Sequence, residues 1–151
     1  MDYRQVCPPY LDILEWYPQL KRLLETDCLT TFREDALRIG PNEWTPWPET
    51  HHYSSSSNDN DDDNASWTVV PLCYCFPATS ADHLQWVPHL RDKFAVTCQL
   101  LQDIVGPFLR TALFSRLAPQ TTLEAHSRWF NLATFVLRLH ILLVIPSNCG
   151  M

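Results

Sequence analysis

The sequence predicts a mainly β fold with N-terminal helices and further helices packed against the sheet. Apolar runs typical of strands cover residues 67–76, 111–117 and 135–145. Apolar residues recur at helical spacing over residues 10–26 and 88–105. Because helical patterns come first and antiparallel-looking strands follow, we expect a small β-sandwich with packed helices.

The N-terminal region, residues 10–26, carries the first helical pattern. Pro18 lies inside it and predicts a kink or the start of a second helix, because proline cannot donate a backbone hydrogen bond. Another short helix is expected over residues 31–39, ended by a Gly-Pro pair. The connector that follows, residues 41–48, is rich in proline and contains two tryptophans. The apolar residues of the first pattern are Ile13, Leu14, Tyr17, Leu20 and Leu24.

Residues 51–64 form a low-complexity Ser/Asn/Asp segment, which predicts a mobile surface loop. One alternative for its acidic run, NDNDDDN at residues 58–64, is calcium binding. The run lacks the glycine turn and the terminal glutamate of an EF-hand loop, so a solvated insertion is favoured. We therefore expect a helical region at residues 1–50, an acidic loop at 51–65 and a β-rich domain at 66–151.

The β-rich region begins with the strand expected at residues 67–76. Pro71 restricts this strand to a sheet edge or to a bulge, since proline cannot complete a central ladder. The helix over residues 88–105 has Pro88 near its start and ends before Gly106. Its apolar stripe is expected to pack on the sheet. The stripe consists of Leu90, Phe94, Cys98, Leu101 and Val105.

Length and composition restrict the class of protein. A chain of 151 residues, 46% of them hydrophobic, can bury one core of ordinary size, which argues against a disordered protein. The net charge of −6 argues against nucleic acid as a partner. No apolar run reaches the roughly 18–20 residues of a membrane span, so none is expected. The N-terminus lacks a signal-peptide core, so a cytoplasmic location is the default expectation.

Six cysteines are scattered through the chain, and only Cys73 and Cys75 lie close together. Alternation along a strand would put both on one face. No CxxC pair occurs, so neither a zinc ribbon nor a thioredoxin-like site is indicated, and reduced, partly buried thiols are expected. A further alternative is zinc held by these two thiols with His51 and His52, which requires the acidic loop to fold back.

Polar side chains interrupt the apolar runs near the end of the chain. Arg138 and His140 lie two residues apart, so in a strand both would project from the same face. An inward-facing cation and imidazole are costly to bury unless they have partners. A bound dicarboxylate and a metal would provide such partners. Ser115 and His126 are expected on adjoining segments.

Motifs in this half of the chain follow a recognisable order and spacing. They are W-x-x-x-x-L at residues 67–72, F-S-x-L at 114–117, P-x-T-x-L-x-x-H at 119–126, Asn131, R-L-H-I at 138–141 and L-V-I-P at 143–146. With them, residues 67–146 resemble the aspartyl/asparaginyl β-hydroxylase family. Its members are iron(II)- and 2-oxoglutarate-dependent dioxygenases with a double-stranded β-helix, or jelly-roll, core. The resemblance implies a partial jelly-roll at residues 66–151.

The resemblance also implies roles for individual residues. His126 matches the first iron ligand and is the expected catalytic residue. Arg138 and His140 match the pair that contacts 2-oxoglutarate, and Trp67 and Ser115 match two further positions of the cosubstrate pocket. These roles suit the residue types, because neutral imidazole binds iron(II) well and the guanidinium forks onto carboxylates. The implied activity is hydroxylation of an amino-acid side chain in a peptide or amino-acid substrate.

The chain departs from the family pattern at several positions. Gln120 replaces the usual turn glycine, and Arg128 stands where a carboxylate would complete a 2-His-1-carboxylate triad with His126. In the family, a second metal-binding histidine and another arginine follow on later strands, whereas this sequence ends at Met151. We therefore expect a C-terminally truncated hydroxylase. The alternative is a degenerate, noncatalytic interaction module that retains the sheet alone.

Overall fold

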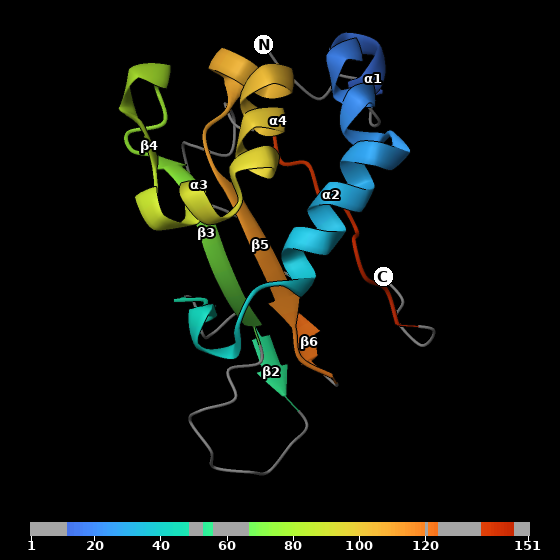
Figure 1. Cartoon of the computed structure of the whole chain (residues 1–151), viewed down its shortest axis with the longest axis vertical. Coiled ribbons are helices and arrows are strands. Elements are labelled where there is room, and N and C mark those ends of the chain that lie inside the picture. The colour runs from blue at the N-terminus through green and yellow to red at the C-terminus, as the bar shows by residue number, and fades with distance from the viewer. Residues whose placement is uncertain (1–11, 49–52, 56–66, 120, 124–136, 147–151) are drawn as a thin grey trace, which may run out of the picture.

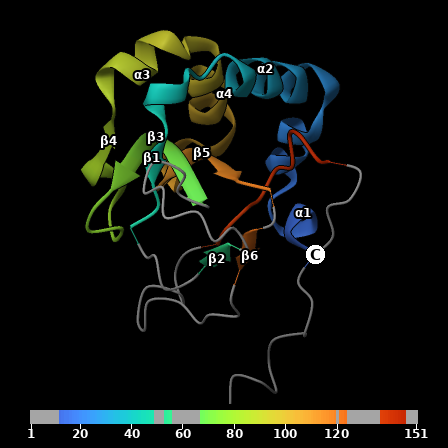
Figure 2. The ribbon, with the colours of Figure 1, turned by 90° about the horizontal axis from the view of Figure 1, so that it is seen from below.

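A layer of helices covers one face of an antiparallel sheet (Figures 1 and 2). More of the described residues lie in helices than in strands, so the fold is mixed. The expectation of helices combined with antiparallel strands is thus confirmed in this coarser form, and the expected predominance of β structure is not found. The computed structural model describes residues 12–48, 53–55, 67–119, 121–123 and 137–146.

The N-terminal helical pattern folds as two short helices. Helix α1 spans Ile13–Trp16 and is capped by Asp12, whose carboxylate accepts hydrogen bonds from backbone N–H groups of the first turn. The 3₁₀ helix η2 spans Pro18–Leu24, with Pro18 at its first position. The prediction that Pro18 begins a second helix is therefore confirmed.

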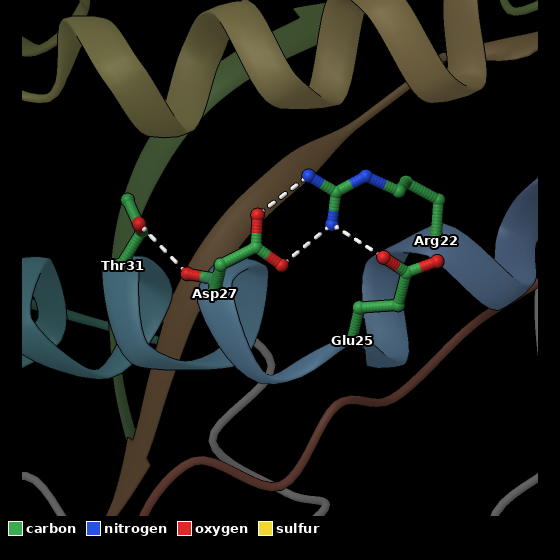
Figure 3. Close-up of polar contacts among 4 residues, drawn as sticks. All are labelled: Arg22, Glu25, Asp27 and Thr31. Atoms are coloured by element: carbon green, nitrogen blue, oxygen red, sulfur yellow. Dashed lines mark hydrogen bonds and ion pairs between the residues drawn. The ribbon is translucent and has the colours of Figure 1, made fainter.

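Helix α2 spans Thr26–Leu37 and begins earlier than the expected start at residue 31. Its first turn is fixed by Arg22, whose guanidinium donates to both carboxylate oxygens of Asp27 at 2.7 and 2.6 Å (Figure 3). The same guanidinium reaches Glu25 at 3.1 Å. This hydrogen bonding lowers the pKa of Asp27 to about 2, which keeps a negative charge at the helix N-terminus. The periodicity of apolar residues does not predict where α2 begins, because its first turn is fixed by polar side chains.

The proline-rich connector joins the helices to the sheet. It contains the 3₁₀ helix η3, Pro41–Glu43, and the short strand β1, Thr45–Pro46. Strand β1 lies antiparallel to β3, which spans Trp67–Cys75, and Thr45 is opposite Val69. The Thr45 hydroxyl also donates to the Val69 carbonyl at 3.0 Å.

A second, two-stranded sheet corrects the expectation of an uninterrupted acidic loop. Strand β2, Tyr53–Ser55, pairs antiparallel with β6, Thr121–Leu123. Residues 53–55 therefore belong to a strand, because their backbone groups find a partner far along the sequence. The remainder of the expected loop lies outside the described residues.

Strand β3 is central in the larger sheet. Strands β1 and β4, Leu84–Trp86, pair with its two ends, and β5, Ala112–Leu117, pairs along it. Pro71 falls at the register shift in the β3–β5 ladder. The predicted bulge at Pro71 is confirmed, and the alternative of an edge strand is wrong.

The predicted central helix forms with one break. Helices α3, Pro88–Lys93, and α4, Ala95–Val105, are separated at Phe94, and the 3₁₀ helix η6, Gly106–Phe108, follows. A further 3₁₀ helix, η5, spans Ala81–His83. Gly106 has a φ of 54°, which glycine adopts without a Cβ penalty. No described helix is long and apolar enough to cross a membrane.

The main core lies between the sheet and helices α3 and α4. Phe94 is 1% exposed and contacts Phe114 edge-on, with ring centroids 5.6 Å apart. A second cluster, under α2, consists of Leu23, Cys28 and Phe32. The first three residues of the expected apolar stripe lie in the main core, as predicted: Leu90, Phe94 and Cys98. The main core consists of Val70, Leu72, Leu90, Phe94, Cys98 and Phe114.

The prediction of a strand at residues 135–145 is wrong for residues 137–145, the part of it that the structure describes. Residues 137–146 have no regular secondary structure, because no described strand pairs with their backbone. Ile141 and Leu143 nevertheless pack against the cluster under α2. Figure 1 shows this segment, in red, running past α2.

Candidate functional site

Two of the five expected site residues are brought together by the sheet. Val69 of β3 pairs with Ser115 of β5, and Trp67 pairs with Leu117, so Trp67 and Ser115 share one sheet face. Trp67 Nε1 donates to Ser115 Oγ at 2.9 Å. Val70 and Phe114 alternate with these residues and pack beneath the helices. The Trp67–Ser115 pair therefore lies on the face away from the helices.

The direction of this hydrogen bond determines what Ser115 can do. An indole nitrogen is only a donor, so the Ser115 oxygen must act as the acceptor. The hydroxyl proton of Ser115 then remains available for another acceptor, such as a carboxylate. Trp67 is 9% exposed and its position is fixed by burial, whereas Ser115 is exposed. The pair can thus present one oriented hydroxyl donor to a ligand.

Trp47, just beyond β1, extends the same site by one strand. Its indole stacks on that of Trp67, with centroids 4.9 Å apart and planes inclined by 18°. Its backbone N–H donates to the Trp67 carbonyl at 2.8 Å. Trp47 was not predicted to belong to this site. The signal available was the pair of tryptophans in the short proline-rich connector.

Arg138 and His140 lie on the segment without regular structure, and both are exposed. The expectation that they face inward from a strand is therefore wrong for this structure. In the same segment, only Ile141 and Leu143 of the described residues are half-buried, and they pack against the cluster under α2. No hydrogen bond or ion pair joins Arg138 or His140 to Trp67 or Ser115 among the described residues. Their assignment to a cosubstrate pocket stays a prediction.

His126, the expected iron ligand, lies outside the described residues, as do Gln120, Arg128 and Asn131. Within the described ranges, no group of three or more His, Cys, Asp or Glu side chains could hold a metal ion. The described residues therefore supply a hydroxyl donor suited to a carboxylate but no set of iron ligands.

The described cysteines lie in the interior of the fold. Burial raises the pKa of Cys73 to about 11, and it raises that of Cys98 to a similar value. Without a bound metal, the Cys73 thiol is therefore protonated at neutral pH, and the zinc alternative stays a prediction. His51 and His52 lie outside the described residues. The prediction of reduced, buried thiols is confirmed for the described cysteines, which are Cys28, Cys73, Cys75 and Cys98.

A shallow depression of about 290 Å³ lies on the helical layer, between α2 and the α3–α4 region. Its buried carboxylate, Asp35, accepts a hydrogen bond from Thr97 at 2.7 Å and pairs with Arg38 at 2.9 Å. The Thr97 hydrogen bond holds α2 against α4, and the Arg38 ion pair lies at the end of α2 itself, so we assign Asp35 a structural role. The depression is lined by Thr31, Glu34, Asp35, Arg38, Lys93, Ala95 and Val96.

Comparison with known proteins identifies one family. The family described as aspartyl/asparaginyl beta-hydroxylase matches residues 26–151 of this chain. The matched range includes α2, every strand of the larger sheet and both members of the Trp67–Ser115 pair. No curated protein and no solved structure gives a significant match.

Proposed function

Because the chain belongs to the aspartyl/asparaginyl beta-hydroxylase family, we propose that it is an iron(II)- and 2-oxoglutarate-dependent dioxygenase domain. Its substrate in this proposal is an amino-acid side chain, either in a peptide or in a free amino acid. The Trp67–Ser115 hydrogen bond is the observation that carries the proposal beyond family membership. It joins two positions, 48 residues apart, that the family resemblance assigns to one cosubstrate pocket.

The proposal gives each residue a limited task. Ser115 donates its hydroxyl proton to a carboxylate of 2-oxoglutarate, and Trp67 holds that hydroxyl in place. Arg138 and His140 contact the same cosubstrate, which requires them to come to the Trp67–Ser115 face. His126 is the proposed iron ligand. When bound, iron(II) would activate dioxygen, the oxidant, and 2-oxoglutarate would be oxidised to succinate and carbon dioxide as the substrate C–H bond is hydroxylated.

We further propose that β3 and β5 belong to a partial jelly-roll. Two features support this architecture: the strands are antiparallel, and the face with Trp67 and Ser115 is turned away from the helical layer. In a double-sheet fold, such a face would lie toward the second sheet and toward a ligand between the sheets.

Succinate formation from 2-oxoglutarate in the presence of iron(II) tests the proposed activity. The parent chain should form succinate, His126→Ala should abolish the reaction, and Ser115→Ala should weaken cosubstrate binding by about tenfold. Ser80→Ala is the matched control, since Ser80 only caps η5. If His126→Ala forms succinate as fast as the parent chain, the assignment of His126 as the iron ligand is contradicted.

The second candidate is a noncatalytic interaction module. Two observations favour it: Arg138 and His140 are exposed, and the described residues contain no group able to hold a metal. Iron content and 2-oxoglutarate binding separate the candidates. A folded parent chain that retains neither iron(II) nor 2-oxoglutarate supports the module, whereas binding of both supports the dioxygenase.

A further inference from the structure

We propose that Trp47 is a positioning residue for the cosubstrate, acting through Trp67 on the hydroxyl of Ser115. The inference rests on the proposed function, because it assumes that Ser115 binds a carboxylate of 2-oxoglutarate. Trp47 itself need not touch the cosubstrate. Its proposed task is to hold the indole of Trp67 in the orientation that fixes Ser115.

The register of the sheet brings the three residues into one row. Strand β1 pairs with β3 through Thr45 opposite Val69 and Pro46 opposite Thr68. The next position places Trp47 beside Trp67, and its backbone N–H indeed donates to the Trp67 carbonyl. Directly opposite residues of antiparallel strands share a face. Within this row Trp47 is directly opposite Trp67, and Ser115, which is opposite Val69, is the diagonal neighbour of Trp67 on the same face.

The contacts within this row fix both ends of Trp67. The backbone of Trp67 is held by the 2.8 Å hydrogen bond from Trp47, and its ring lies against the Trp47 ring at 4.9 Å. At the far edge of the indole, Nε1 donates to Ser115 at 2.9 Å. A tryptophan side chain has two torsions, so a stack on one ring face restricts its rotation and thereby fixes the direction in which Nε1, at the ring edge, donates to Ser115.

Loss of the Trp47 ring should loosen this arrangement. The Trp67 indole could then rotate, and Ser115 would lose the donor that orients its hydroxyl. The hydroxyl proton of Ser115 could then point to acceptors other than the cosubstrate. Weaker binding of 2-oxoglutarate should result, with little change in the rate at saturation, because Trp47 does not contact the reacting atoms.

Trp44 provides a matched control within the same connector. It lies on the other side of the strand, where its ring is 4.5 Å from the Arg116 guanidinium and packs against the main core. Trp44 and Trp47 are both half-buried. Replacing Trp44 therefore removes a similar ring without disturbing the row of Trp47, Trp67 and Ser115.

The experiment measures 2-oxoglutarate binding by calorimetry, with manganese(II) replacing iron(II) so that no turnover occurs. Trp47→Ala should weaken binding about threefold to tenfold, whereas Trp47→Phe, which keeps a stacked ring, should stay within about twofold of the parent. Trp44→Ala should leave the affinity unchanged. In the double variant Trp47→Ala/Ser115→Ala, affinity should equal that of Ser115→Ala alone, since both changes remove one effect. Urea unfolding establishes that each variant is folded.

The outcomes distinguish this inference from the proposed function. If the parent binds 2-oxoglutarate and Trp47→Ala binds it equally well, the role of Trp47 is overturned while the proposed function stands. Additive losses in the double variant also overturn it, because they indicate a general structural effect. A parent that binds no 2-oxoglutarate overturns both. Non-additive losses with rescue by Trp47→Phe support the positioning role.

Discussion

Strand β3 and the segment at residues 137–146 are both apolar, yet they have different structures. Most side chains of β3 are buried, and its backbone pairs with β1, β4 and β5. In the segment at residues 137–146, the side chains of Leu142 and Val144 are each 58% exposed, and no described strand pairs with the segment. The comparison teaches that apolar composition predicts burial, whereas strand formation depends on a neighbour for the backbone hydrogen bonds.

The two regions also differ in how many layers cover them. Helices α3 and α4 pack on β3 and β5, so Phe94 and Phe114 meet in the interior. The segment at residues 137–146 packs through Ile141 and Leu143 alone, on the side next to the helices. Burial on one side leaves the other side of the segment in solvent. The stability of the described fold should therefore depend mainly on the helix-covered face of the sheet.

The largest effect is expected from Phe94→Ala. Phe94 is 1% exposed and contacts Phe114 at 5.6 Å, so its removal leaves a cavity in the main core. We expect a loss of about 3–5 kcal/mol in the free energy of unfolding, measured in urea. Phe108→Ala is the control, since Phe108 is 63% exposed and should cost less than about 1 kcal/mol. Equal losses in the two variants would contradict the location of the core.

The fold was predictable where the signal is local. Helical spacing over residues 88–105 anticipates α3 and α4, and Pro71 anticipates the bulge in β3. The early start of α2 was missed, because it depends on the ion pair of Arg22 with Asp27. Strand β2 was missed because its partner, β6, lies far along the chain. Long-range pairing cannot be deduced from local periodicity.

The candidate site was predictable only in part. The resemblance assigned Trp67 and Ser115 to one pocket, and the β3–β5 register brings them into contact. Nothing in the sequence showed that Trp47 would stack on Trp67, because that contact follows from the pairing of β1 with β3. Arg138 and His140 were expected to share an inward face, but their segment lacks the strand partner that this expectation required.

An intermediate effect is expected from alkaline pH, which acts on the thiols of the helix-covered face. Burial raises the pKa of Cys73 and Cys98 to about 11, against an ordinary value of 9.0. Both thiols therefore stabilise the fold fully below pH 9, and this contribution is lost as the pH rises through 11. The expected loss is roughly 2 kcal/mol for each thiol.

Unfolding free energies between about pH 8 and about pH 11 test this contribution, because that range runs from below the ordinary thiol pKa up to the raised one. The double variant Cys73→Ala/Cys98→Ala should show a shallower decline than the parent. All other side chains are the same in the two proteins, so the difference between the two declines reports the two thiols. Parallel curves for parent and variant would contradict the assigned role of burial.

The smallest effect is expected from two neighbouring leucines in the segment at residues 137–146. Leu143 is half-buried and packs against both core clusters, whereas Leu142 is 58% exposed. Leu143→Ala should lower the free energy of unfolding by about 1 kcal/mol, and Leu142→Ala by less than about 0.5 kcal/mol. Because the two substitutions remove the same atoms from adjacent positions, their difference isolates the packed side of the segment. A larger loss in Leu142→Ala than in Leu143→Ala would contradict this assignment, because the side chain that packs against the core clusters must cost more to remove.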